Sequence, residues 1–215
     1  IIEPIQGESG ILPATQEYLQ AARRLCDEHG ALLILDEVQT GMGHTGKLFA
    51  YEHYGITPDI ISSAKALGCG FPIGAILTTD KIAPTFGPGT HGSTFGGNPM
   101  ACAVGSRAFD IINAPETLAH VEQQGQKLQT ALREIGEKTG VFKEVRGMGL
   151  LLGCVLADEY AGKASEITAA ALKHGLMVLV AGANVVRFAP SLLLNDEDMA
   201  EGLKRFEVAL NEWLA

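Results

Sequence analysis

Residues 32–48, LLILDEVQTGMGHTGKL, place an acidic pair after an apolar run and continue into a glycine-rich loop that ends in lysine. Asp36 and Glu37 could hold Mg²⁺, and Gly41–Lys47 matches the G-x-x-x-x-G-K of a phosphate-binding P-loop. A P-loop needs a strand that runs straight into the glycines and a Ser or Thr after the lysine. Here several residues separate the run from the loop, and Leu48 occupies the hydroxyl position. The stretch therefore argues against nucleotide hydrolysis.

Asp36 and Lys65 are the residues best placed for other chemistry, because each follows an apolar run that is typical of a buried strand. A carboxylate at the carboxyl end of such a strand lies where α/β sheets bind ligands, although it could equally cap a helix. An amine in an apolar setting would have a lowered pKa, which suits Schiff-base chemistry. It could also simply extend from a strand end into solvent. Together the two residues predict one crevice at the ends of successive strands.

The elements expected around these residues alternate between strands and helices. TQEYLQAARRLCDEHG predicts a helix with Thr15 as the N-cap and Gly30 as the stop signal. A continuous apolar run such as ALLIL suits a strand that is buried on both faces of a parallel sheet. Alternation of this kind indicates an α/β layered fold. The expected strands are 1–5, 31–35, 59–64 and 73–79.

The pattern changes after a long helix. Helices are expected over 98–112 and from Pro115 to about 138, the second rich in Gln, Glu and Lys on one side. Beyond them we expect strands in VFKEVRG, LLLGCVLA, MVLVAG and VVRFAP, and helices near 163–174 and 196–213. We therefore divide the chain into a first domain over 1–112, a bridging helix over 113–139 and a smaller α/β domain over 140–215.

Composition and charge exclude several classes of function. The 215 residues carry a net charge of −9 without any run of Lys or Arg, which disfavours nucleic acid and anionic membranes as partners. No apolar stretch approaches the roughly 20 residues that span a bilayer. The four cysteines form no C-x-x-C pair and fit no zinc motif, so we expect no metal and free thiols in a reducing cytoplasm.

Six stretches together resemble the class III, or ornithine-type, aminotransferases. They are EPIQGE, LDEVQTG, TPDIISSAKALGCGFPIGA, GTHGSTFGGNPMA, VRGMGLLLG and VVRFAPSL, in the family's order along the whole chain. The resemblance implies fold type I and pyridoxal 5′-phosphate as cofactor. Because the chain opens in IIEPI and the family's N-terminal half is absent, we expect the C-terminal part of the large parallel-sheet domain, followed by a small C-terminal α/β domain.

The resemblance assigns the cofactor to residues of the first domain. Lys65 would bond to the cofactor aldehyde and then move the substrate proton as acid and base. Asp36 would pair with the pyridine nitrogen and keep the ring protonated, and Gln39 would contact the phenolic oxygen. Thr94 would reach across a homodimer to the partner's cofactor phosphate, and Ser93 lies in the same glycine-rich turn, where hydroxyls and backbone N–H groups suit phosphate.

The resemblance assigns substrate binding to Arg187 and Glu8. Arg187 would hold a substrate α-carboxylate, for which the planar guanidinium is suited. Glu8 would pair with Arg187 while the substrate carries its amine on a side chain, and would leave when glutamate or 2-oxoglutarate binds. Judged without the family, an ordinary structural salt bridge explains these two residues equally well.

The C-terminal stretches are most similar to family members that act on acylated ornithines. The implied reaction, within arginine metabolism, transfers the ω-amino group of N-acetylornithine or N-succinylornithine to 2-oxoglutarate and gives glutamate and a semialdehyde. Alternatives are ornithine or 4-aminobutyrate as the amine donor, or a non-catalytic fragment of such an enzyme. Three positions depart from the family pattern: Ser9, His44 and Cys69. A Cβ at Cys69 would be strained if that residue requires a positive φ.

Overall fold

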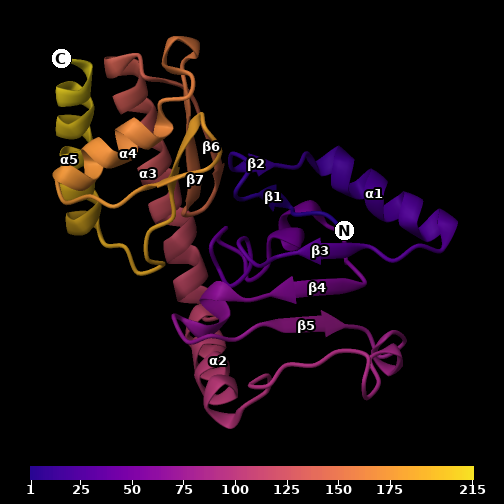
Figure 1. The fold of residues 1–215 in the computed structure, drawn as a ribbon. Helices are drawn as coiled ribbons and strands as arrows, with labels where there is room; N and C mark the ends of the chain where they lie inside the picture. Colours follow the sequence, from indigo (N-terminus) through magenta and orange to yellow (C-terminus); the bar gives the residue numbers. More distant parts are fainter. The chain divides into compact units, whose positions relative to one another are not determined.

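The computed structural model describes residues 1–215 as two compact units (Figure 1). Unit 1 comprises Ile1–Pro4, Ala14–Gly43 and Lys47–Leu118, and unit 2 comprises Ile5–Pro13, His44–Gly46 and Ala119–Ala215. Two short segments from early in the chain therefore fold with the C-terminal residues. No helix in either unit combines the length and the apolar character needed to cross a membrane.

Unit 1 is built on a three-stranded sheet of order β3-β4-β5. Strands β3 (Ile34–Asp36) and β4 (Ile60–Ser63) are parallel, with Asp36 opposite Ser62. Strand β5 (Ala75–Thr78) is antiparallel to β4. The parallel pairing that the apolar runs suggested holds for β3 and β4, whereas β5 pairs antiparallel, because apolar patterning carries no information on strand direction.

The helices of unit 1 occupy their expected ranges, and the first begins and ends at its expected signals. Helix α1 (Gln16–His29) starts at Thr15, whose side chain accepts a hydrogen bond from the Tyr18 amide, and ends at Gly30 in the left-handed conformation. Helix α2 (Pro99–Ile112) starts at Asn98, whose side chain accepts from the Ala101 amide. Three short 3₁₀ helices complete the unit: η1 (Ala50–Tyr54), η2 (Lys65–Gly68) and η3 (Ala83–Thr85).

The N-terminal apolar run does not form the single strand expected over 1–5. Ile2 makes one parallel bridge to Leu35. Pro4 follows, and proline has no N–H to continue a ladder. The next residues form β1 (Ile5–Gln6), which pairs with β2 (Leu12–Pro13) as an antiparallel hairpin of unit 2.

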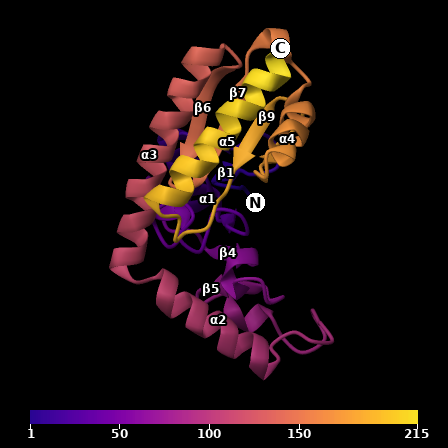
Figure 2. The same ribbon diagram turned by 90° about the vertical axis from the view of Figure 1, so that its left-hand side faces the viewer.

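Unit 2 is a four-stranded antiparallel sheet of order β6-β7-β9-β8 with helices on one face. Figure 2 shows α3 (Pro115–Thr139), α5 (Asp196–Leu214) and α4 (Ala164–Lys173) side by side in front of the sheet. A short 3₁₀ helix, η4 (Asp158–Tyr160), precedes α4. The four strands are β6 (Phe142–Met148), β7 (Leu151–Leu156), β8 (Leu179–Val180) and β9 (Val185–Phe188).

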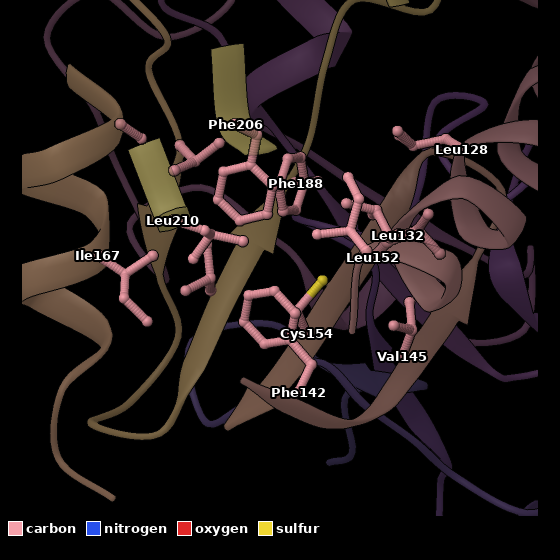
Figure 3. Close-up of a cluster of buried hydrophobic side chains, with 14 of the residues drawn as sticks. Leu128, Leu132, Phe142, Val145, Leu152, Cys154, Ile167, Phe188, Phe206 and Leu210 are labelled. Atoms are coloured by element: carbon pink, nitrogen blue, oxygen red, sulfur yellow. The ribbon is translucent and has the colours of Figure 1, made fainter. Parts of the chain in front are cut away.

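Strand β7 is buried along its whole length because both of its faces are covered. Leu152 and Cys154 face the helices and join the larger core, where Phe206 packs against Phe142 and Phe188 (Figure 3). Leu151 and Val155 face the other way and pack with Ile5 and Ile11 of the hairpin. This two-sided burial explains why LLLGCVL is apolar throughout and lacks the alternation of a half-exposed strand.

Candidate active site

Asp36 ends β3, and two hydrogen bonds orient its carboxylate. Oδ1 accepts from the Ser62 hydroxyl on the neighbouring strand and from the Val38 amide, both at 3.0 Å. The carboxylate therefore closes a turn, and the alternative of a helix cap is wrong, since no helix begins at Asp36. Both bonds use Oδ1, so Oδ2 is available to a further partner.

Lys65 opens η2, two residues beyond the end of β4. Because β3 and β4 are parallel, Asp36 and Lys65 leave the sheet at the same edge, as the sequence predicted. The Lys65 backbone has φ 49°, a left-handed conformation that is uncommon outside glycine. Its side chain is exposed, so the apolar setting expected for this amine is wrong.

The turn after Lys65 contains a second non-glycine residue in the left-handed region. Cys69 has φ 45° and ψ 40° at the C-terminal end of η2, where glycine is usual. Glycine at this position would avoid the Cβ clash. The strain anticipated from the sequence is therefore present.

Replacing Cys69 by glycine is expected to stabilise the chain by about 1 kcal/mol, the approximate cost of a Cβ in the left-handed region. Equilibrium urea unfolding followed by circular dichroism measures the change. Cys69→Ala is the matched control, because it removes the thiol and keeps the Cβ. Equal stabilisation by both variants would contradict backbone strain as the cause.

Glu37 is a buried carboxylate that sequence analysis considered only as a possible magnesium ligand. Its oxygens accept hydrogen bonds from the amides of Ala50 and Tyr51, at 2.9 and 2.8 Å, and from the Thr40 hydroxyl. These bonds fasten the loop after β3 to the start of η1. Burial raises the pKa of Glu37, and the three hydrogen bonds oppose that rise. Its position beside Asp36 was the only signal in the sequence.

The raised pKa of Glu37 predicts a pH-dependent stability. The folded chain holds the Glu37 proton more tightly than the unfolded chain, so the free energy of unfolding falls as pH rises above the ordinary pKa of 4.5 and through the raised one. Glu37→Gln mimics the protonated side chain and removes this dependence. We expect the stability of the variant relative to the native chain to increase with pH across that window.

Urea unfolding at intervals between about pH 4 and 8 measures this difference. Glu17→Gln is the control, because Glu17 is an exposed carboxylate on α1, whereas the charge of Glu52 itself contributes to the raised pKa of Glu37. A Glu37→Gln difference that stays flat or falls with pH would refute the prediction.

The other residues assigned to the cofactor lie on two different segments of unit 1. Gln39 is half-buried in the loop that Glu37 fastens. Ser93 and Thr94 are exposed on the segment between β5 and α2. Ser93 lines a pocket of about 740 Å³ together with Asn98, the N-cap of α2. A helix N-terminus of this kind attracts anions such as phosphate.

Glu8 and Arg187 are brought together in unit 2 although they are far apart in the chain. Arg187 lies on β9, and its Nη1 donates to Glu8 Oε1 at 2.7 Å. The Arg187 side chain is 10% exposed, whereas that of Glu8 is 71% exposed. The Arg187 Nε is buried and has no hydrogen-bond partner. The guanidinium therefore retains an unused donor of the kind that a second carboxylate could satisfy.

The side chains of unit 1 suit the groups of pyridoxal phosphate. Asp36 offers a carboxylate oxygen for a ring nitrogen, and Lys65 offers an exposed amine for an aldehyde. Ser93 and Thr94 offer hydroxyls near a helix N-terminus for a phosphate. The donor set thus fits the cofactor that the resemblance implies.

A family model described as aminotransferase class-III matches residues 1–210. The chain is 81% identical over 215 residues to the acetylornithine aminotransferase of Neisseria meningitidis serogroup B, covering 100% of this chain and 54% of that protein. It is 57% identical over 209 residues to the succinylornithine transaminase of Citrobacter koseri, covering 97% of this chain and 52% of that protein.

Solved structures of aminotransferases are also similar to this chain. The N-acetylornithine aminotransferase from Stenotrophomonas maltophilia superimposes with a TM-score of 0.91 at 47% identity, over 99% of this chain and 56% of that one. The ornithine aminotransferase from Plasmodium yoelii gives 0.90 at 31% identity, over 99% and 56%. The chain thus spans about half the length of the curated relatives it matches.

Proposed function

We propose, from the premise that the chain belongs to the class-III aminotransferases, that it takes part in transferring the ω-amino group of N-acetylornithine or N-succinylornithine to 2-oxoglutarate. The products would be glutamate and a semialdehyde. The names of the two curated relatives, an acetylornithine aminotransferase and a succinylornithine transaminase, support these donors over ornithine or 4-aminobutyrate. The same names favour a place in arginine metabolism.

The observation that carries the proposal is the Glu8–Arg187 pair. Arg187 is nearly buried and keeps an unpaired Nε, while its partner Glu8 is largely exposed. Separating an exposed carboxylate from its partner costs little free energy, because water already contacts the carboxylate and replaces the lost ion pair. Arg187 can then hold the carboxylate of glutamate or 2-oxoglutarate, and Glu8 returns when the substrate presents no carboxylate there. One arginine thereby serves substrates of different charge in turn.

The residues of unit 1 would serve the cofactor. Pyridoxal phosphate, when bound, supplies an aldehyde for condensation with amines and a ring that withdraws electrons from the carbon that loses its proton. Asp36, oriented by Ser62, would hold the proton on the ring nitrogen. Lys65 would hold the cofactor through its amine and would move the substrate proton as acid and base.

The remaining assignments concern assembly. Thr94 is exposed on the segment before α2, which suits a side chain that serves a neighbouring subunit. We expect a homodimer in which Thr94 contacts the phosphate held by the partner, with Gln39 beside the ring of its own subunit. A cytoplasmic location stays a prediction from the cysteine pattern.

The cofactor assignment is tested by adding pyridoxal phosphate to the purified chain and recording the visible spectrum. Borohydride reduction followed by peptide mass spectrometry should place the cofactor on the peptide that contains Lys65. A label spread over many lysines would contradict the assignment.

The donor is tested by incubating the chain with 2-oxoglutarate and each of four amines, N-acetylornithine, N-succinylornithine, ornithine and 4-aminobutyrate, while glutamate formation is measured. The proposal requires the acylated ornithines to be the fastest donors.

A further inference from the structure

The hairpin that carries Glu8 contains an unusual backbone. Its loop, Gly7–Ile11, connects β1 to β2 and includes Gly10 with φ 115° and Ile11 with φ 50°. A β-branched residue at positive φ is strained and persists only where its surroundings hold it. Ile11 is also fully buried, so the loop is fixed at this end although Glu8 itself is exposed.

Arg146 on β6 provides that hold. Its Nε donates to the carbonyl oxygens of Gly10, at 3.0 Å, and Ile11, at 3.1 Å, and its Nη2 donates to the Gly10 oxygen at 2.8 Å. Nη1 pairs with Glu144 at 3.1 Å. The guanidinium thus clamps the two residues of positive φ, of which Ile11 is strained. Figure 1 shows the β1–β2 hairpin beside β6 and β7.

The sheet register places Arg146 and Arg187 in one row. Arg146 is opposite Gly153 on β7, and Gly153 is opposite Arg187 on β9. Directly paired residues of antiparallel strands project from the same face. Between the arginines, Gly153 leaves room for Ile11, since a Cβ on Gly153 would lie 2.9 Å from the Ile11 Cβ. One arginine therefore holds the base of the loop, and the other meets the carboxylate at its tip.

We infer that Arg146 is a positioning residue that presents Glu8 to Arg187 and so sets how strongly Glu8 competes with a bound carboxylate. The inference rests on the carboxylate exchange proposed above for Arg187. Arg146 has no direct contact with the substrate in this role. Its effect passes through the Gly10–Ile11 backbone.

The test is the affinity of the purified chain for 2-oxoglutarate, measured by an NMR titration of backbone amides. While Glu8 is paired with Arg187, 2-oxoglutarate cannot bind Arg187. The apparent affinity for 2-oxoglutarate is therefore reduced in proportion to the fraction of molecules in which the pair is open. Glu8→Gln should therefore increase the affinity for 2-oxoglutarate. No variant that only releases Glu8 can increase this affinity further, so the Glu8→Gln increase is an upper limit. Arg146→Met should tighten binding up to that limit, by as much as about tenfold if the pair is closed in nine molecules of ten. Arg146→Lys keeps the charge but lacks the planar fork whose Nε and Nη2 reach the two carbonyls, so its affinity should fall between.

A double-mutant cycle separates this role from general damage. In the Glu8→Gln background, Arg146→Met should leave the affinity unchanged, because there is no competing carboxylate left to position. A merely structural role would weaken binding in both backgrounds, and that result would overturn the inference. Lys143→Met, on the same strand and with the same change in charge, is the control and should have no effect.

Two further outcomes are distinguishable. If Glu8→Gln tightens binding and Arg187→Met loses it, but Arg146→Met changes nothing, the inference fails and the proposed function stands. If Arg187→Met leaves binding intact, the proposed carboxylate site itself fails. Circular dichroism and thermal unfolding check that each variant is folded. Should Arg146→Met not fold, Arg146→Lys carries the test.

Discussion

Replacing Lys65 by alanine is expected to abolish transamination, with a loss of roughly 10⁴-fold or more, as when a residue that acts directly in the chemistry is removed. Lys65 would both hold the cofactor and move the substrate proton, and no neighbouring residue of η2 carries an amine. Glutamate formation from 2-oxoglutarate and an acylated ornithine measures the activity. The visible absorbance that depends on added pyridoxal phosphate should disappear with it.

Lys65→Arg is the informative control, because it keeps the positive charge and removes the nucleophilic amine. It should be as inactive as Lys65→Ala if covalent chemistry is required. A control on the surface of the same unit, Lys81→Ala, should keep the native rate, since Lys81 lies beyond β5. Native turnover by Lys65→Ala would sink the assignment of the catalytic amine.

Replacing Phe206 by alanine is expected to lower the free energy of unfolding of unit 2 by about 3–5 kcal/mol. Phe206 is fully buried between β6 and β9, with its ring centroid 5.9 Å from that of Phe142 and 5.0 Å from that of Phe188 (Figure 3). Truncation removes the apolar burial and leaves a cavity where α5 meets the sheet. A loss of this size is a large part of the stability of a typical domain.

Trp213 gives a local measurement, because it is the chain's single tryptophan and lies on the same helix. Urea unfolding followed by its fluorescence reports on unit 2. Val208→Ala, at a position on α5 that is 40% exposed, is the matched control and should cost well under 1 kcal/mol. Phe206→Leu should cost less than Phe206→Ala, since it fills part of the cavity. Similar losses for Val208→Ala and Phe206→Ala would show that the aromatic cluster is not what holds α5.

The local signals of the sequence determined most of the elements. Thr15, Gly30 and Asn98 mark helix ends because their side chains or backbone freedom satisfy terminal peptide groups wherever the helix packs. The apolar runs located the strands of both sheets, including β7, which is covered on both faces. The sequence also placed Asp36 and Lys65 after successive strands, and their parallel pairing confirms the shared edge.

Only the tertiary structure decided how distant segments meet. The residues before and after Pro4 separate into two units, and β5 runs against β4, because pairing depends on which long-range partner covers each strand. Glu37 anchors its loop through hydrogen bonds from amides in η1, more than ten residues away. The spacing of residues along the sequence does not reveal such partners. The placement of Glu8, Arg146 and Arg187 around Ile11 likewise requires the register of three strands and the lack of a side chain at Gly153, against which Ile11 packs. Hydrophobic patterning specifies which residues are buried, but register, strand direction and the hydrogen-bond partners of buried polar groups arise when the chain closes on itself.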